Sequence, residues 1–245
     1  MTIKYKIKIS AVSYLNTKPF VYGLQHSDII NEIDLSLDIP SMCAKKLLND
    51  EVDIGLVPVS ILPELKEHYI LTDYCIGAEG AVKSVILFSE VPLNEIKNIY
   101  LDYQSKTSVQ LVKVLAQNFW KIKPAWIDAD KNYEEEISDY AAGIVIGDRA
   151  LELKNKFKFS YDLAEEWKKF TGLPFIFACW VSNKKLPEAF INKFNQAICF
   201  GIENKESVIT NPNEREYFEK YISYEFDEKK KKAMKLFLEL SDLIK

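Results

Sequence analysis

The hydrophobic and polar positions of the first 60 residues switch between the period of a strand and the period of a helix. Residues 3–12 alternate apolar and polar side chains and then become apolar, which predicts a strand entering a buried sheet. Two further strands are predicted at 35–39 and 54–57, and the second is wholly apolar, as in a parallel strand covered on both faces. Between them, apolar residues over 44–48 lie at helical spacing behind Ser41, the predicted N-cap. This alternation predicts right-handed βαβ units and an open parallel sheet.

The same pattern begins again in the middle of the chain. A strand is predicted at 99–102, followed by a loop at 104–108 and an amphipathic helix at 109–120 opened by Ser or Thr. A second buried strand is predicted at 143–146, with a helix beginning near Arg149. The remaining apolar patterns predict helices at 161–170, 187–204, 211–221 and 227–245, and a strong apolar strand at 175–181.

Two rounds of the pattern predict two lobes, each an open, mostly parallel α/β sheet flanked by helices, with a ligand cleft between them. Lobe 1 is expected to comprise residues 1–87 and 180–245, and lobe 2 residues 88–179. The crossing strands are predicted near 82–90 and 175–182. No fixed-period repeat or low-complexity linker is present, so strands rather than a flexible tether should join the lobes.

Composition narrows the class of protein. With 48% hydrophobic residues in 245, the chain can form its core without metals or disulfides, and its net charge of −4 argues against a nucleic-acid-binding surface. The four cysteines are widely spaced, which favours buried reduced thiols over a zinc site or disulfides. Without a signal sequence or a long apolar segment, we expect a cytoplasmic protein that does not contact a membrane.

Polar loops follow four of the predicted strands, where ligands bind in open α/β sheets. They comprise Ser13, Tyr14, Asn16 and Thr17; Pro58 and Ser60; Ser105, Thr107 and Ser108; and Gly147 and Asp148. Each polar residue alone could simply cap a helix, with Asn16 or Thr17 capping the helix that holds Pro19 in its first turn. Arginine occurs only at 149 and 215. The four loops together therefore predict a site that holds carboxylates by amides, hydroxyls and helix dipoles.

Conventional catalytic groups are scarce. His26 and His68 lie in polar stretches and are expected at the surface. Asp148 is the best-placed carboxylate, although an Asp at this position often caps a helix. Residues 134–136 and the lysines at 229–232 are expected to face solvent. No GxSxG, Walker, GxGxxG or HExxH motif is present, which weighs against serine hydrolysis, phosphoryl transfer and hydride transfer.

Five sequence blocks, taken together, resemble the chorismate dehydratases of the futalosine route to menaquinone. They are VSYLNTKPF, DIGLVPVS, SKTS before a helix, IGDRAL and YDLAEEWKKFTGLPFIFACW. The resemblance runs from Ile9 to about Asn183, and the helices that follow contribute little to it. It implies a type II periplasmic-binding-protein-like fold and conversion of chorismate to 3-[(1-carboxyvinyl)oxy]benzoate and water.

The resemblance also implies roles for individual residues. Asn16 matches the residue most closely tied to the chemistry, and Ser84 joins the loop residues as a candidate for binding the anionic substrate. Lys106 stands where the family usually has Arg, so a bidentate contact there is lost if that Arg touches substrate. No cofactor or metal is implied. We expect a monomer or a weak homodimer.

Three other functions are weighed against the dehydratase. A solute-binding subunit of a transporter would bind a small carboxylate without turnover, and the sister dihydroxynaphthoate synthase carries a Cys-Pro-Asn-Asp pattern where this chain has Tyr-Leu-Asn-Thr. An effector domain of a transcription regulator would need a preceding helix-turn-helix. An amide is not basic, so the base would be a substrate carboxylate, a water or a group not yet identified.

Overall fold

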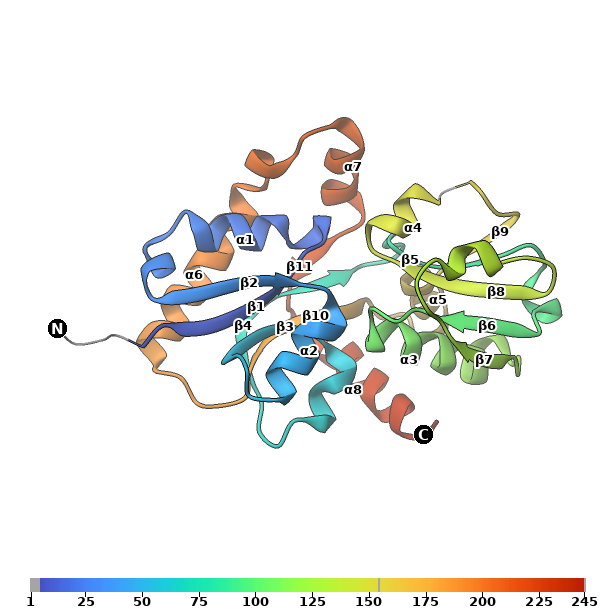
Figure 1. Cartoon of the computed structure of the whole chain (residues 1–245), viewed down its shortest axis with the longest axis horizontal. Helices are drawn as coiled ribbons and strands as arrows, with labels where there is room; N and C mark the ends of the chain where they lie inside the picture. Colours follow the sequence, from blue (N-terminus) through green and yellow to red (C-terminus); the bar gives the residue numbers. More distant parts are fainter. Residues whose placement is uncertain (1–4, 154, 245) are drawn as a thin grey trace. The chain divides into compact units, whose positions relative to one another are not determined.

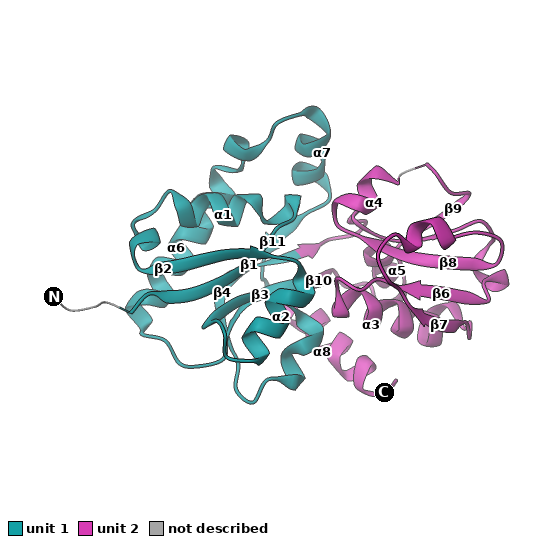
Figure 2. Cartoon of the chain, in the orientation of Figure 1, with its two compact units in different colours: residues 1–76, 177–227 teal, residues 77–176, 228–245 magenta. Residues whose placement is uncertain are grey.

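The computed structural model describes residues 5–153 and 155–244, and these form two compact units (Figure 1, Figure 2). Unit 1 contains residues up to Ile76 together with Phe177–Asp227, and unit 2 contains Gly77–Ile176 together with the residues from Glu228 onward. Both units are therefore discontinuous in sequence. Predicted residues 3 and 4 of the first strand lie outside the described residues.

Unit 1 is built on a six-stranded sheet in the order β11-β4-β10-β3-β1-β2. The first three strands along the chain are parallel, and β10 runs antiparallel to β3. Every residue of β3 and β10 is buried, which explains their continuous apolar sequences. The strands are β1 Ile7–Val12, β2 Ile33–Asp38, β3 Ile54–Pro58, β4 Tyr69–Ala78, β10 Phe175–Ser182 and β11 Ser223–Glu225.

The helices of unit 1 include one unusually close pair. A Cβ atom on Gly23 would lie 2.0 Å from the carbonyl oxygen of Ala197, and one on Gly201 would lie 2.0 Å from that of Pro19. Glycine at both positions therefore allows α1, which begins at the turn after β1, to pack against α6. The helices are α1 Lys18–Gln25, α2 Pro40–Leu48, α6 Glu188–Glu203 and α7 Pro212–Lys220.

Unit 2 is built on a five-stranded sheet in the order β7-β6-β8-β5-β9. β6 is parallel to β7 and β8, whereas β5 is antiparallel to β8 and β9, so the sheet is mixed rather than mostly parallel. The strands are β5 Val85–Ser89, β6 Asn98–Leu101, β7 Ala125–Asp128, β8 Ala141–Ile146 and β9 Phe159–Asp162.

An aromatic cluster forms part of the core of unit 2. Trp167 packs edge-on against Phe175 and Phe237, with ring centroids 5.3 and 6.1 Å apart, and all three side chains are almost fully buried. The last helix, α8, thereby joins this unit. The helices are α3 Lys106–Leu115, which continues as a π-helical turn over Ala116–Trp120, and α4 Asp148–Glu152, α5 Leu163–Thr171 and α8 Glu228–Asp242.

The division into units differs from the sequence prediction in two places. The first boundary follows Ile76 instead of residue 87, because β5 pairs with β8 and β9 inside unit 2 and does not cross between units. The described residues from Glu228 onward belong to unit 2, and Phe237 among them completes its aromatic core. The predicted strand at 175–182 is confirmed as β10, and the chain passes between units within it.

Several local predictions were also wrong. Ile39, not Ser41, is the N-cap of α2, and residues 159–162 form strand β9 before α5 begins. Lys106 opens α3, so most of the predicted polar loop is the first helical turn. Lys230 is 1% exposed and donates to Glu79 Oε1 at 2.7 Å, unlike its neighbours in the lysine run, which face solvent as expected.

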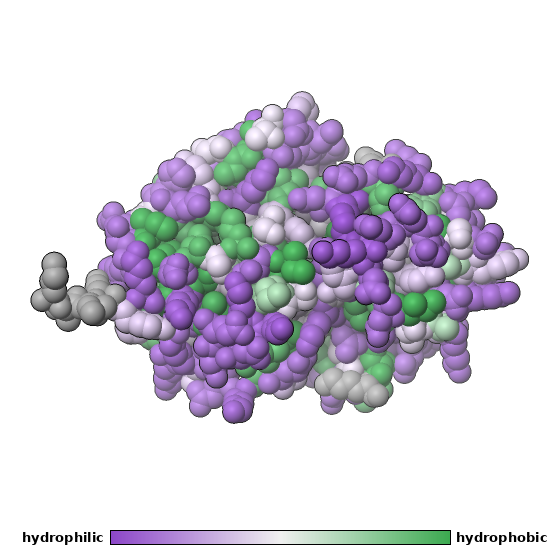
Figure 3. Space-filling view, in the orientation of Figure 1, coloured by the Kyte–Doolittle hydropathy of each residue, from purple (hydrophilic) through white to green (hydrophobic). Residues whose placement is uncertain are grey.

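Hydrophilic side chains cover much of the visible face of each unit, interrupted by hydrophobic ones (Figure 3). Among the described residues, no helix combines the length and the apolar character needed to cross a membrane. The exposed large hydrophobic side chains are scattered over both units and are Tyr5, Leu37, Met42, Trp126, Tyr140, Phe200 and Leu243.

Candidate functional site

The predicted polar turns of unit 1 lie at one edge of its sheet. β1 and β3 are parallel neighbours, with Ile9 opposite Ile54, so their carboxyl ends and the turns that follow them are adjacent. The first turn holds Ser13 to Thr17, and the second holds Pro58 to Ser60. The structure therefore brings the unit 1 candidates together, although binding by them stays a prediction.

Asn16 has an unusual set of contacts in the first turn. Its side-chain oxygen accepts a hydrogen bond from the Thr17 hydroxyl at 3.2 Å, and its backbone oxygen accepts one from the Tyr224 hydroxyl at 2.8 Å. Within the described part of the chain, the Asn16 side-chain nitrogen makes no hydrogen bond. The residue is half-buried. It therefore holds an amide donor at the strand edge that a ligand could use.

The other unit 1 candidates divide between scaffold and surface. Thr17 and Pro58 are buried, and Thr17 occupies the N-cap position of α1 without a side-chain capping bond. Ser13 is exposed, and its backbone nitrogen donates to Asp38 O at 2.9 Å, which ties the turn to β2. Tyr14 and Ser60 are half-buried. Ser13 thus presents its hydroxyl to solvent at the same turn as Asn16.

The candidates of unit 2 also share one sheet edge. β6 and β8 are parallel, and β5 runs antiparallel to β8 with Val85 opposite Ile146. The start of β5 therefore lies beside the ends of β6 and β8. Gly147 N donates to Ser84 O at 2.8 Å across this edge. Ser84, the start of α3 and the turn at Gly147 are accordingly neighbours.

The first turn of α3 uses part of its polar side chains for capping. The Ser105 hydroxyl accepts from the backbone nitrogen of Ser108 at 3.3 Å and lies 3.1 Å from the Ser108 hydroxyl. Thr107 is fully buried, whereas Lys106 is exposed. Ser105 therefore caps α3, which is the simpler of the two roles considered for it. The start of this ten-residue helix directs its backbone amides toward the sheet edge.

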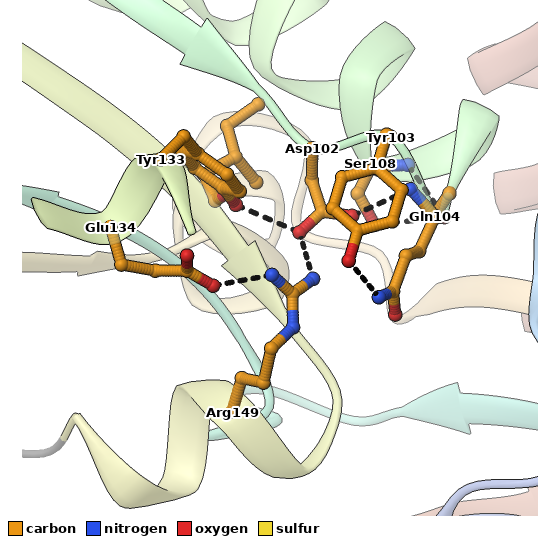
Figure 4. Close-up of polar contacts among 9 residues, drawn as sticks. Asp102, Tyr103, Gln104, Ser108, Tyr133, Glu134 and Arg149 are labelled. Carbon is orange, nitrogen blue, oxygen red and sulfur yellow. Dashed lines mark hydrogen bonds and ion pairs between the residues drawn. The ribbon is translucent and has the colours of Figure 1, made fainter. Parts of the chain in front are cut away.

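A buried polar cluster of Asp102, Tyr133, Glu134 and Arg149 lies at this sheet edge and was not predicted from the sequence (Figure 4). Asp102, 2% exposed, follows β6 and accepts hydrogen bonds from the Tyr133 hydroxyl at 2.8 Å and the Gln104 backbone nitrogen at 2.7 Å. Arg149, from α4, forms ion pairs with Asp102 and Glu134. The cluster joins the turn after β6 to the turn after β8.

Electrostatics within the cluster follow from burial. Burial raises the pKa of Asp102 above its usual value, and the Arg149 charge opposes that shift. Burial acts to lower the pKa of Arg149, but the neighbouring Asp102, Tyr133 and Glu134 side chains together outweigh it, so the pKa of Arg149 is raised. Glu134 is therefore an ion-pair partner and not simply a solvent-facing residue. The sequence signal was a carboxylate directly after a buried strand, which requires a partner.

Both arginines of the chain are engaged by carboxylates. Arg149 pairs with Asp102 and Glu134, and Arg215 pairs with Glu206 at 2.6 Å on the surface of unit 1. That amides and hydroxyls hold the anion of a ligand stays a prediction.

Asp162 fixes the segment that leads to Ser84. Its carboxylate accepts from the backbone nitrogens of Val82 and Lys83 at 2.9 and 2.7 Å, and from those of Ala164 and Glu165 at 3.1 and 3.2 Å. Burial raises the pKa of Asp162, and the backbone donors of Lys83, Val82 and Glu165 act against that shift. The Asp of the YDLAEEW block is therefore the N-cap of α5 and the anchor of the turn before β5.

The remaining candidates offer little conventional chemistry. His26 and His68 are exposed, as predicted. Three of the four free cysteines are buried, and burial raises the pKa of Cys43 and Cys179 to about 12, so neither thiol is a nucleophile at neutral pH. Asp148 is exposed and Gly147 occupies the N-cap position in its place. Among the described residues, no group of three His, Cys, Asp or Glu is arranged to hold a metal ion.

Comparison with solved structures defines the class of fold. Protein AF1704 from Archaeoglobus fulgidus matches with a TM-score of 0.75 at 16% identity, covering 97% of each chain. A Candida albicans protein described as having the generic periplasmic-binding-protein fold matches with a TM-score of 0.64 at 13% identity, covering 98% of this chain and 90% of that one. The sulphonate-binding protein SsuA of Escherichia coli matches with a TM-score of 0.60 at 13% identity, covering 97% of this chain and 91% of that one. The chain has a periplasmic-binding-protein-like α/β fold.

Comparison with known sequences identifies the family. A profile of the menaquinone biosynthesis family matches residues 7–242, and the chain belongs to that family. The chorismate dehydratase of Campylobacter jejuni is 26% identical over 240 residues, covering 93% of this chain and 94% of that one. The chorismate dehydratase of Thermus thermophilus is 29% identical over 173 residues, and this match spans only 61% of either chain.

Proposed function

We propose that this protein is a chorismate dehydratase, a carbon-oxygen lyase that forms 3-[(1-carboxyvinyl)oxy]benzoate in the futalosine route to menaquinone. Membership of the menaquinone biosynthesis family and the two relatives named chorismate dehydratase support the proposal. The observation that carries it is Asn16, whose side-chain nitrogen makes no hydrogen bond with the described residues while its backbone is held in place.

The reaction suits a site without a strong base of its own. Removal of the ring proton beside the enolpyruvyl ether gives a carbanion conjugated through the ring double bond to the carboxylate. The neighbouring hydroxyl leaves as hydroxide and takes up a proton to form water, and the ring becomes aromatic. Aromatisation supplies the thermodynamic drive, so the protein has to orient the dianion and stabilise developing charge.

The residues divide this work between them. We assign Asn16 an orienting and hydrogen-bonding role, because an amide donates but does not take up a proton at neutral pH. The base is then a substrate carboxylate, a water or a group not identified. In this proposal the substrate carboxylates are held by hydroxyls and backbone amides of the strand-end turns, and the candidates include Ser13, Thr107 and Gly147.

The decisive experiment mixes purified protein with chorismate, follows the loss of the diene absorbance and identifies the product by mass. Asn16→Ala should lower kcat roughly a hundredfold or more, the scale seen when one preorganised donor is lost, with a modest effect on KM. Asn31→Ala removes an exposed amide in the same unit and should leave kcat unchanged. Full activity of Asn16→Ala would refute the role of Asn16, and an inactive wild type would refute the dehydratase.

A non-catalytic carboxylate-binding protein is the second candidate. The described strand-edge turns hold no histidine, and the SsuA structure is that of a binding protein of similar fold. This function predicts that chorismate binds and is recovered intact, whereas the sister dihydroxynaphthoate synthase would leave chorismate unchanged.

Cellular location and assembly complete the proposal. We place the protein in the cytoplasm as a monomer or weak homodimer. Fractionation of cells and analytical ultracentrifugation test these two points.

A further inference from the structure

Strand β11 places a buried tyrosine beside the first turn of unit 1. Ser223–Glu225 pairs with β4 at the sheet edge, and the adjoining Phe226 N donates to Asp73 O at 2.8 Å. The Cys75 thiol, which is also on β4, donates to Glu225 O at 3.7 Å. β4 therefore anchors the chain at the two residues that follow Tyr224.

The Tyr224 ring has little freedom to move. The residue is 6% exposed, and its ring packs edge-on against Phe20, with centroids 5.1 Å apart. Phe20 in turn packs against Trp180 on β10 at 5.9 Å. Such packing fixes the ring orientation and hence the direction of the hydroxyl.

The Tyr224 hydroxyl is committed to one partner. It donates to Asn16 O at 2.8 Å, and within the described residues this is its one hydrogen bond. Burial raises the pKa of Tyr224 well above its usual value, so the hydroxyl keeps its proton across the pH range of an assay. The donor and acceptor are 208 positions apart in the chain.

We propose that Tyr224 is a positioning residue that holds the backbone of Asn16 and thereby aims its side-chain amide at the substrate. This inference rests on the proposed function of Asn16. It assigns a functional task to a segment, β11, in which the sequence resemblance is weak. The task needs only the hydroxyl, because the ring contact with Phe20 is the same for phenylalanine.

The test is Tyr224→Phe, which removes the donor and keeps the ring. A displaced catalytic group costs up to about a hundredfold in rate, and we expect about a tenfold fall in kcat here because the Thr17 contact remains. KM should change less than twofold, since Tyr224 does not touch substrate. Tyr22→Phe is the control: its hydroxyl makes no hydrogen bond with the described residues, and kcat should be unchanged.

A double variant separates positioning from general destabilisation. If Tyr224 acts only through Asn16, Asn16→Ala/Tyr224→Phe should have the same residual kcat as Asn16→Ala alone. A further tenfold loss in the double variant, or unchanged kcat in Tyr224→Phe, would overturn the proposal.

A second readout does not depend on turnover. The NMR signal of the Asn16 side-chain amide, assigned by its disappearance in Asn16→Ala, should shift in Tyr224→Phe and stay in place in Tyr22→Phe. An inactive wild type whose Asn16 signal still shifts in Tyr224→Phe would reject the dehydratase and keep the structural link. An unmoved signal would reject the link itself.

Discussion

The turn after β1 in unit 1 and the turn after β6 in unit 2 follow equivalent strands but use their polar side chains differently. In the first, the Asn16 amide nitrogen has no hydrogen-bond partner among the described residues. In the second, the Asp102 carboxylate is bound by Tyr133, Arg149 and the Gln104 backbone. One polar turn thus leaves a donor that a ligand could use, whereas the other uses its polar groups to hold its own conformation.

The largest expected effect on stability comes from breaking the unit 2 cluster. Arg149→Met leaves the buried Asp102 carboxylate without its ion pair. The free energy of unfolding of unit 2 should therefore fall by about 3 kcal/mol. Asn16→Ala should alter the free energy of unfolding by no more than about 0.5 kcal/mol. Urea unfolding followed by circular dichroism measures both.

The second arginine of the chain provides a matched control. Arg215 pairs with Glu206 at the surface, and both side chains are about half exposed. Arg215→Met should therefore lower the free energy of unfolding by at most about 1 kcal/mol. Adding Asp102→Asn to Arg149→Met should recover part of the loss, because the unpaired charge is then removed. An equal loss of unfolding free energy in Arg149→Met and Arg215→Met would contradict the claim that the polar groups after β6 hold that turn in shape.

A smaller effect is expected at the turn after β8. Gly147 has φ 64° and ψ −146°, a conformation that residues with a Cβ avoid, so Gly147→Ala should destabilise unit 2 by about 1 to 3 kcal/mol. Gly80→Ala serves as the control, since its added Cβ would have open space around it. Thermal unfolding of the two variants, compared with wild type, shows whether the Gly147 turn is as rigidly specified as its contact with Ser84 implies.

The smallest effect is a pH dependence of opposite sign in the two units. Burial acts to raise the pKa of Asp38 in unit 1, but hydrogen bonds from Lys46, Ser10 and Ser36 outweigh it and lower the pKa. Its contribution to stability is therefore present above its ordinary pKa near 4 and lost as the pH falls through the lowered value. We expect that contribution to be about 1 kcal/mol or less.

Asp102 should behave in the opposite way, because burial raises its pKa. Above pH 4 the folded protein binds more protons at this site than the unfolded chain, so stability falls as the pH rises toward the raised value. For each of Asp38→Asn and Asp102→Asn, the unfolding free energy of the variant is subtracted from that of wild type at several pH values from 3 to 6. Plotted against pH, the two differences should have slopes of opposite sign. Slopes of the same sign would contradict this assignment.

Part of the site could be predicted from sequence because its signals are local. The end of a buried strand followed by polar residues located the turns at Asn16, Ser60, Thr107 and Gly147, and the structure places them at one edge of each sheet. The assignment of Ser105 to a cap was also a local pattern. Local patterns suffice where the chain itself positions the residue.

Long-range contacts were missed for the opposite reason. The bond from Tyr224 to Asn16 and the pairing of Arg149 with Asp102 join segments far apart in the chain, and no spacing rule connects them. Lys230 looked like part of a solvated run, yet tertiary packing buries it beside Glu79. The predicted helix at 161–170 begins only at Leu163, because residues 161 and 162 end strand β9 and Asp162 caps α5 directly after it.

The discontinuity of unit 2 has a consequence for how the chain is made. Phe237 on α8 closes the aromatic core around Trp167 and Phe175, yet it is synthesised roughly 60 residues after the rest of that unit. At typical translation rates the ribosome needs about 3 to 12 seconds for that stretch. During this interval the nascent chain exposes the apolar surface that Phe237 later covers. A chain terminated before α8 should therefore depend on chaperones or aggregate.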